Sequence, residues 1–234
     1  MLKLHTYDII KTATLQVKEL SQERGFPLHA GLYASWGVGK TIACKQIIKE
    51  AYDVFYFKFP PRHLEPAGAI KELLTSMGVG ATRGYLNNYD FLIKFLQARG
   101  ITKPVLIIDE AQLLFTQPKL LSFFKDLSED IEINFSYVFL GDEKLKDLLK
   151  RDFHSIIKRI KIKLEIPQIT KETIQKLADF HQITLPEEAF NIALSMNATT
   201  MDIDFALYLA KKANLTELDE KKFKAFIKKS KTGV

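Results

Sequence analysis

Eight consecutive residues carry the clearest chemistry in this sequence. A bound triphosphate needs a turn whose backbone N–H groups converge on its oxygens, a lysine for the terminal phosphates and a hydroxyl for Mg²⁺. Gly37 and Gly39 suit the turn, while Lys40 and Thr41 supply the two side chains. The run matches a nucleotide-binding P-loop except that Ala34 replaces the first glycine, and it predicts ATP as the ligand. The predicted ATP-binding residues are Ala34, Ser35, Trp36, Gly37, Val38, Gly39, Lys40 and Thr41.

The segments on either side of this run support the assignment. Residues 27–33 read as a short buried strand, and residues 41–51 have the length and composition of a helix. Strand, loop and helix is the order that a P-loop requires, and the helix N-terminus adds partial positive charge to the phosphate site. Trp36 could contact a base or a partner subunit, but we expect it to pack on its own domain. Cys44 is expected to be a small buried residue.

A second candidate lies in the strand-like run 105–110. Four aliphatic residues precede Asp109 and Glu110, as expected of a buried strand that delivers carboxylates at its C-terminal end. We interpret the run as a Walker B motif. Asp109 and Thr41 are predicted to hold Mg²⁺, Asp109 through water, and Glu110 to polarise the water that attacks the γ-phosphate.

Asp142 ends a third strand-like run, residues 135–142. At the end of that strand its carboxylate could orient the hydrolytic water. It could equally well cap the N-terminus of a helix over residues 143–150. Both roles are compatible, and both stay open from the sequence.

Arg159 stands directly before an alternating strand-like run, residues 160–166. In an oligomeric ATPase, an arginine in this position can reach the γ-phosphate of the neighbouring subunit and stabilise the transition state. The alternative is a surface arginine in an ordinary salt bridge. Arg159 is the preferred candidate for action in trans, and Arg151 is the second.

The order of the candidate elements favours a parallel sheet. Strands alternate with helical patterns through the first two thirds of the chain, which is typical of an α/β fold with helices on both faces of the sheet. Beyond Pro167 the strand signals stop. We therefore predict a nucleotide-binding core with a short N-terminal helix over residues 1–167 and a small helical lid with a basic tail over residues 168–234. The other expected elements are a strand at 53–59 and helices at 66–77, 88–99, 170–181, 186–196, 200–213 and 219–229.

Composition limits the class of protein. The chain has 234 residues, of which 47% are hydrophobic, enough for a sizeable core. One cysteine excludes an internal disulfide framework, and the five histidines lack metal-ligand spacing. No secretory signal or long apolar run is present, so we expect a cytoplasmic protein with no membrane partner.

The net charge of +6 permits a polyanionic partner. The excess gathers in two places, around residues 158–163 and 221–231. Lysines at these places can displace the counterions of duplex DNA, although a solvated helix end explains the second cluster equally well. The predicted DNA-binding residues are Lys158, Lys161, Lys228 and Lys229.

Taken together, these motifs give the chain a family resemblance. With its P-loop, the DEAQ box at residues 109–112, the polar residue after the third strand and the C-terminal helices, it resembles the AAA+ ATPases. Residues 153–159 and 174–183 are similar to the corresponding part of the phage Mu transposition protein B family. This resemblance implies an ATP-dependent, non-sequence-specific protein that assembles helical filaments on double-stranded DNA, captures target DNA and stimulates a transposase.

Three features depart from that family pattern. We expect no helix-turn-helix appendage before the P-loop region, and residues 197–204 lack the arginine that often senses nucleotide. Asp142 stands where asparagine or a similar residue is usual, and a carboxylate near a triphosphate is repelled unless a cation or donor compensates. Slow hydrolysis is expected from the third departure.

Two other functions stay open. A partner-remodelling AAA+ protein, such as a secretion-type ATPase or a helicase loader, would have a similar layout. A monomeric P-loop kinase is a third reading, but Glu110 after Asp109 and the long helical lid argue against it.

Overall fold

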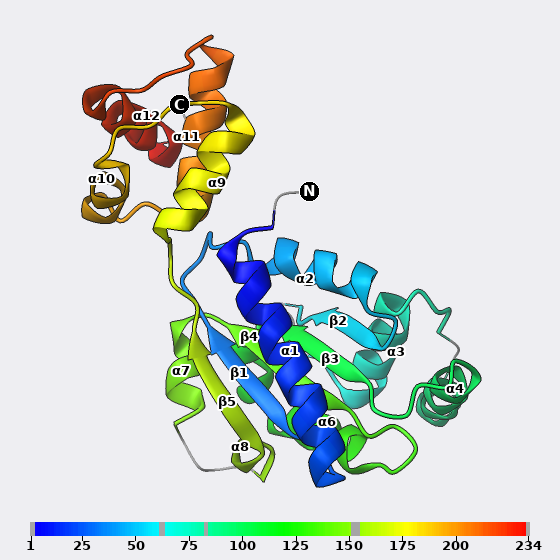
Figure 1. Ribbon diagram of the computed structural model, residues 1–234. Coiled ribbons are helices and arrows are strands. Elements are labelled where there is room, and N and C mark those ends of the chain that lie inside the picture. Colours follow the sequence, from blue (N-terminus) through cyan, green and yellow to red (C-terminus); the bar gives the residue numbers. More distant parts are fainter. Residues whose placement is uncertain (1–2, 61–63, 82–83, 151–154, 233–234) are drawn as a thin grey trace. The chain divides into compact units, whose positions relative to one another are not determined.

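The computed structural model describes residues 3–60, 64–81, 84–150 and 155–232. It divides into two compact units. The loop unit contains Met1–Ile9, Ala34–Ala43 and Ile166–Val234, and the sheet unit contains Ile10–Tyr33 and Cys44–Glu165. Figure 1 shows the elements coloured along the sequence.

A five-stranded sheet in the order β2-β3-β4-β1-β5 forms the centre of the sheet unit. Every neighbouring pair is parallel, so all the strands end at the same edge. This parallel sheet with helices on both faces is the predicted fold class, which is confirmed. The strands are β1 (His29–Tyr33), β2 (Val54–Lys58), β3 (Val105–Asp109), β4 (Ser136–Gly141) and β5 (Ile160–Glu165).

One face of this sheet carries the larger core. Alternate strand residues such as Phe57, Ile108 and Phe139 point to this face, as the period of two in a strand requires. The helices that follow β2, β3 and β4 in the chain pack against this face and complete the core. These helices are α3 (Pro66–Ser76), α4 (Tyr85–Ala98), α5 (Ala111–Phe115), α6 (Pro118–Glu129), α7 (Glu143–Leu148) and α8 (Ser155–Lys158).

Two helices continue into the sheet unit from the loop unit, α1 (His5–Arg24) and α2 (Lys40–Glu50). Within the sheet unit, Lys11 of α1 forms a 3.0 Å ion pair with Glu50 of α2. The sequence predicts only a short N-terminal helix, whereas α1 has 20 residues. Its buried stripe includes alanine and threonine, whose weak hydrophobicity hides the helical period.

The helices α5, α6 and α8 have no counterpart among the sequence-based predictions. The signal for α6 was present, because Pro118 occupies its first turn. Leu120, Phe124 and Leu127 then recur at helical spacing and are fully buried. This helical spacing is easily missed when no capping side chain marks the start of the helix.

Four helices in the loop unit build a separate core. Thr170 caps α9 by accepting a hydrogen bond from the Thr173 amide, and Thr199 forms a capping box with Asp202 at the start of α11. The predicted start of the second helix at 186 is wrong, since α10 begins at Ala189. The helices are α9 (Lys171–His181), α10 (Ala189–Ser195), α11 (Thr200–Lys212) and α12 (Glu220–Thr232).

Candidate functional site

The phosphate-loop residues belong to the loop unit. Gly37 has a φ of +83° and Gly39 a φ of +88°, a region that side chains rarely adopt. Both glycines of the motif are therefore required by the backbone itself. Ala34 is not among the described residues with positive φ, which explains why alanine is tolerated where the usual motif has glycine. Lys40 and Thr41 form the first turn of α2, where backbone N–H groups face outward along the helix axis.

The Lys40 ammonium group folds back over its own loop. Its Nζ atom donates hydrogen bonds to the carbonyl oxygens of Ala34 at 3.0 Å and Ser35 at 3.1 Å. An ionised phosphate oxygen is a stronger acceptor for an ammonium group than a neutral carbonyl. Lys40 is thus held inside the loop by bonds that a phosphate group could replace.

Two other residues of this region have clear positions. Cys44 is fully buried, as predicted. The expectation that Trp36 packs on its own domain is wrong, because its side chain is 75% exposed. Its neighbours Ser35 and Gly37 cannot cover so large a ring from within a tight turn.

In the sheet unit, Asp109 ends β3 as predicted and is 1% exposed. Its Oδ2 atom accepts a 2.8 Å hydrogen bond from the Tyr56 hydroxyl on the neighbouring strand β2. Its Oδ1 atom accepts a 3.1 Å bond from the Glu110 amide. Both oxygens are oriented by donors, which fixes the carboxylate at the C-terminal edge of the sheet.

Glu110 follows with a left-handed backbone, φ +59°. A residue with a side chain adopts this conformation at some energetic cost, and such residues are enriched at functional sites. Gln112 donates a 2.7 Å hydrogen bond from Nε2 to Glu110 Oε2. Gly141 at the end of β4 makes room for this glutamine, since a Cβ atom there would lie 2.5 Å from Gln112 Oε1.

Asp142 is the N-cap of α7. Its Oδ1 atom accepts a 2.9 Å hydrogen bond from the Lys144 amide. The capping role considered from the sequence is therefore confirmed, and this donor offsets part of the carboxylate's charge. Tyr33 pairs with Gly141 in the register of β1 and β4, so the chain enters the phosphate loop from the sheet edge that carries Asp109, Glu110 and Asp142.

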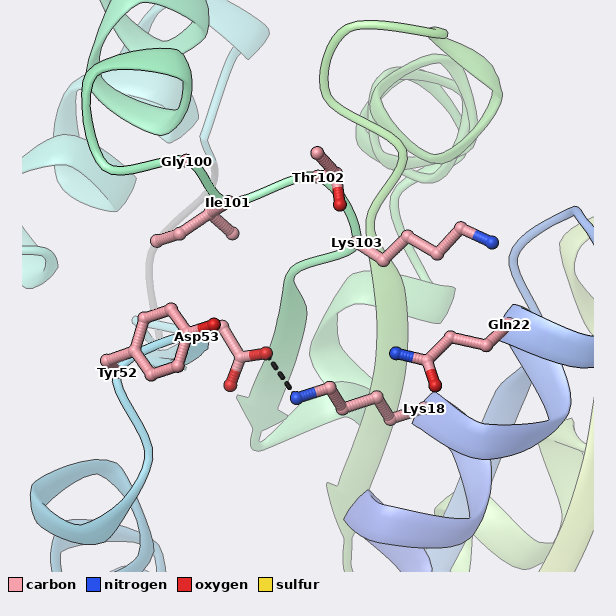
Figure 2. Close-up of a pocket in the computed structure, with 8 residues that line it drawn as sticks. All are labelled: Lys18, Gln22, Tyr52, Asp53, Gly100, Ile101, Thr102 and Lys103. Atoms are coloured by element: carbon pink, nitrogen blue, oxygen red, sulfur yellow. Dashed lines mark ion pairs between the residues drawn. The ribbon is translucent and has the colours of Figure 1, made fainter.

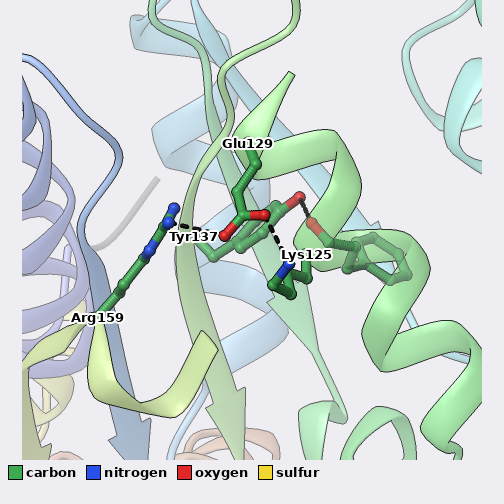
Figure 3. Close-up of polar contacts among 5 residues, drawn as sticks. Lys125, Glu129, Tyr137 and Arg159 are labelled. Carbon is green, nitrogen blue, oxygen red and sulfur yellow. Dashed lines mark hydrogen bonds and ion pairs between the residues drawn. The ribbon is translucent and has the colours of Figure 1, made fainter. Parts of the chain in front are cut away.

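Arg159 lies at the opposite edge of the sheet. It directly precedes β5, whose first residue pairs with His29 at the start of β1. Its Nη2 atom donates to Glu129 Oε1 at 2.7 Å, and Lys125 Nζ approaches the other carboxylate oxygen of Glu129 at 2.6 Å, as Figure 3 shows. The salt-bridge alternative for Arg159 is thus present in the structure, while Arg151 lies outside the described residues.

Two hollows open at this same N-terminal edge, away from Asp109, Glu110 and Asp142. The larger has a volume of about 400 Å³ and is lined by Arg159, Glu129 and the exposed side chain of Ile131. The smaller has a volume of about 100 Å³ and contains an ion pair between Lys18 and Asp53 (Figure 2). Neither hollow is lined by a residue of the phosphate loop or by Asp109, Glu110 or Asp142.

The predicted DNA-binding lysines are all exposed and belong to different units. Lys158 and Lys161 are at the end of α8 and on the edge strand β5 of the sheet unit. Lys228 and Lys229 are on α12 of the loop unit. Other lysines of the basic tail are engaged within that unit, as Lys231 donates to the Met196 carbonyl at 2.6 Å.

Within the described ranges, no group of three or more His, Cys, Asp or Glu side chains could hold a metal ion on its own. A Mg²⁺ ion at Asp109 would therefore depend on further ligands such as phosphate and water. None of the helices in these ranges is long and apolar enough to cross a membrane.

Comparison with known protein families decides the classification. The family described as "AAA domain" matches residues 29–149, more than half of the chain. The chain belongs to this family. A search of curated protein sequences gives no match.

Several solved structures share this fold. The Aeropyrum pernix ORC2 protein, in ADPNP–ADP complexes, superposes with a TM-score of 0.67 at 14% identity, covering 96% of this chain and 67% of that one. The Aeropyrum pernix ORC1 protein in complex with DNA gives 0.59 at 16% identity, covering 96% and 65%. The Thermotoga maritima RuvB Holliday junction branch migration motor gives 0.56 at 18%, covering 94% and 68%. The AAA chain thus spans about two thirds of the length of these structures.

Proposed function

We propose that this AAA protein is an ATPase that uses nucleotide as a switch for DNA binding. The observation that carries the proposal is the arrangement of the phosphate loop. Positive φ angles at Gly37 and Gly39 open the backbone, and the Lys40 ammonium group is held inside the turn at 3.0 Å from Ala34. A loop of this shape, entered from the carboxyl edge of a parallel sheet, suits a triphosphate.

In this proposal the residues have separate roles. Lys40 would hold the terminal phosphates, and Thr41 and Asp109 would hold Mg²⁺, which would neutralise charge on the phosphate oxygens. Glu110 accepts a proton from the attacking water. Asp142 orients that water, and its Oδ1 atom also caps α7. Arg159 acts in trans: it leaves its ion pair with Glu129 and contacts the γ-phosphate bound to the next subunit.

We further propose the transposition role that the Mu transposition protein B resemblance implies. The protein would assemble as a homo-oligomer, in the form of a helical filament, on double-stranded DNA, and would select target DNA and stimulate a transposase. The helices of residues 168–234 would act as a lid on a core of residues 1–167. Exposed lysines in both units support a duplex partner, because each phosphate contact releases counterions.

Enzyme assays with duplex DNA test this proposal. Wild type should hydrolyse ATP slowly and faster with DNA, and electron microscopy with ATP should show filaments whose DNA affinity falls steeply with salt. Glu110→Gln should keep ATP binding while hydrolysis drops by orders of magnitude, whereas Lys40→Ala should lose ATP binding itself. Equal hydrolysis by wild type and Glu110→Gln, or no ATP-dependent binding to DNA, would reject the assigned roles.

One surface favours a second candidate, a partner-remodelling ATPase whose client is a protein. Met201, Phe205 and Tyr208 are exposed on one face of α11, and the rings of Phe205 and Tyr208 stack with centroids 6.0 Å apart. Exposed apolar side chains grouped in this way are typical of protein contacts. Isolated particles on bare DNA, together with ATP-dependent binding of a protein client, would favour this candidate.

A further inference from the structure

Two carbonyl groups of the phosphate loop are held from outside the loop, and both contacts lie within the loop unit. The Gly37 carbonyl accepts a 3.0 Å hydrogen bond from the Met201 amide, in the first turn of α11. The Val38 carbonyl accepts a 2.6 Å bond from the hydroxyl of Thr6, in the first turn of α1. Thr6 is 1% exposed, so this bond is shielded from water.

These two bonds fix the direction of the loop's N–H groups. A trans peptide is planar, and its C=O and N–H point in opposite directions. Because the Gly37 carbonyl points to Met201, the Val38 N–H points away from α11. Because the Val38 carbonyl points to Thr6, the Gly39 N–H points away from α1.

The supports themselves are firmly held. His5, the neighbour of Thr6, donates from Nε2 to the Pro167 carbonyl at 2.8 Å, and its Nδ1 is hydrogen bonded to the Thr173 hydroxyl at 2.5 Å. At the other contact, a Cβ atom on Gly37 would lie 2.7 Å from Thr199 Oγ1, so the loop packs closely against the α11 cap. Neither support can shift without breaking further bonds.

We propose that Thr6 is a positioning residue for nucleotide phosphates. Its hydroxyl, together with the backbone of α11, sets the peptide planes of residues 37–39 before nucleotide arrives, so that the Val38 and Gly39 N–H groups are available to phosphate oxygens. The inference rests on the proposed nucleotide binding. It also gives α11 a contact with the phosphate loop although residues 197–204 contain no arginine.

The test compares three variants by titration with a fluorescent ADP analogue. Thr6→Val removes the hydroxyl and keeps the branched shape, and should weaken affinity about fivefold, the size expected for one buried hydrogen bond. Thr6→Ser restores the hydroxyl and should recover most of the affinity. Thr14→Val is the matched control, because Thr14 is equally buried in α1 but donates to the Ile10 carbonyl of its own helix.

A second readout isolates the phosphates. The inhibition constant of tripolyphosphate, obtained by displacement and corrected for the affinity of the ADP analogue itself, should be about fivefold higher for Thr6→Val than for wild type, since the altered contact acts on the phosphate loop alone. Equal losses in Thr6→Val and Thr14→Val would overturn the inference, and so would no loss in either. If Lys40→Ala abolishes binding while Thr6→Val binds normally, only this inference fails. If wild type binds no nucleotide, the proposed function fails as well.

Discussion

Gln112 Nε2 lies 2.7 Å from Glu110 Oε2 and donates a hydrogen bond to it. Glu110 is the N-cap residue of α5 and has a left-handed backbone, and Gln112 lies in the first turn of that helix. Gln112 is 8% exposed and Glu110 is partly exposed, so the contact is partly buried. One oxygen of the proposed base is therefore fixed while the other stays available, which makes Gln112 a candidate for orienting that base.

Replacing Gln112 with leucine should lower kcat about thirtyfold and leave ATP affinity unchanged. The substitution removes a hydrogen bond to a charged group, worth about 2 kcal/mol, without touching the phosphate loop. Steady-state ATPase assays and nucleotide titration separate the two effects. Gln97→Leu is the control, because Gln97 makes a similar bond to Glu132 on the exposed surface. A Gln112→Leu enzyme with wild-type kcat would show that Glu110 needs no such support.

Site residues that belong to a contiguous motif can be predicted from the sequence, whereas contacts between distant segments cannot. The phosphate loop is predictable because its residues are contiguous and its glycines mark positions with positive φ angles. Gln112 could have been found in the same way, since it is the last residue of the DEAQ box. Thr6 could not, because its contact with Val38 joins segments far apart in the chain. The pairing of Arg159 with Glu129 is non-local in the same sense.

Arg159 offers a prediction that distinguishes a trans-acting role from a structural one. Arg159→Ala should reduce the turnover of assembled protein by at least a hundredfold and leave nucleotide binding intact. Glu129→Gln breaks the same ion pair but keeps the guanidinium group, so its turnover should match or exceed wild type. ATPase rates measured across a range of protein concentrations provide the readout. If both variants behave alike in turnover and stability, the ion pair is only structural.

The two groups of exposed lysines can be separated by the salt dependence of DNA binding. Each lost phosphate contact should reduce the slope of log K against log salt by about 0.9. The double variant Lys228→Ala/Lys229→Ala should therefore lower the slope by about two if α12 contacts DNA. Lys158→Ala/Lys161→Ala makes the same test for the sheet unit. Lys211→Ala/Lys212→Ala, also exposed, changes the net charge equally and should leave the slope unchanged.

His29 predicts how stability depends on pH. Burial, reinforced by the charge of Arg159, lowers the pKa of His29 from 6.5 to about 3. Its Nδ1 accepts a 3.1 Å hydrogen bond from the Tyr137 amide, which places the proton of the neutral ring on Nε2. Between pH 6.5 and 3 the unfolded chain binds a proton at this position and the native chain does not. Stability therefore falls as the pH is lowered through this window.

Unfolding in urea at pH 7, 6 and 5 measures this effect. Between pH 7 and pH 5, proton binding by unfolded His29 should lower the free energy of unfolding of the wild type by about 2 kcal/mol, since one pKa unit corresponds to about 1.4 kcal/mol. In His29→Asn the side-chain oxygen can still accept from the Tyr137 amide, but nothing at this position titrates. The variant should start less stable, because the ring leaves a gap in the core, and should lose less on acidification. Parallel pH profiles for the two proteins would show that His29 is protonated equally in the native and unfolded states.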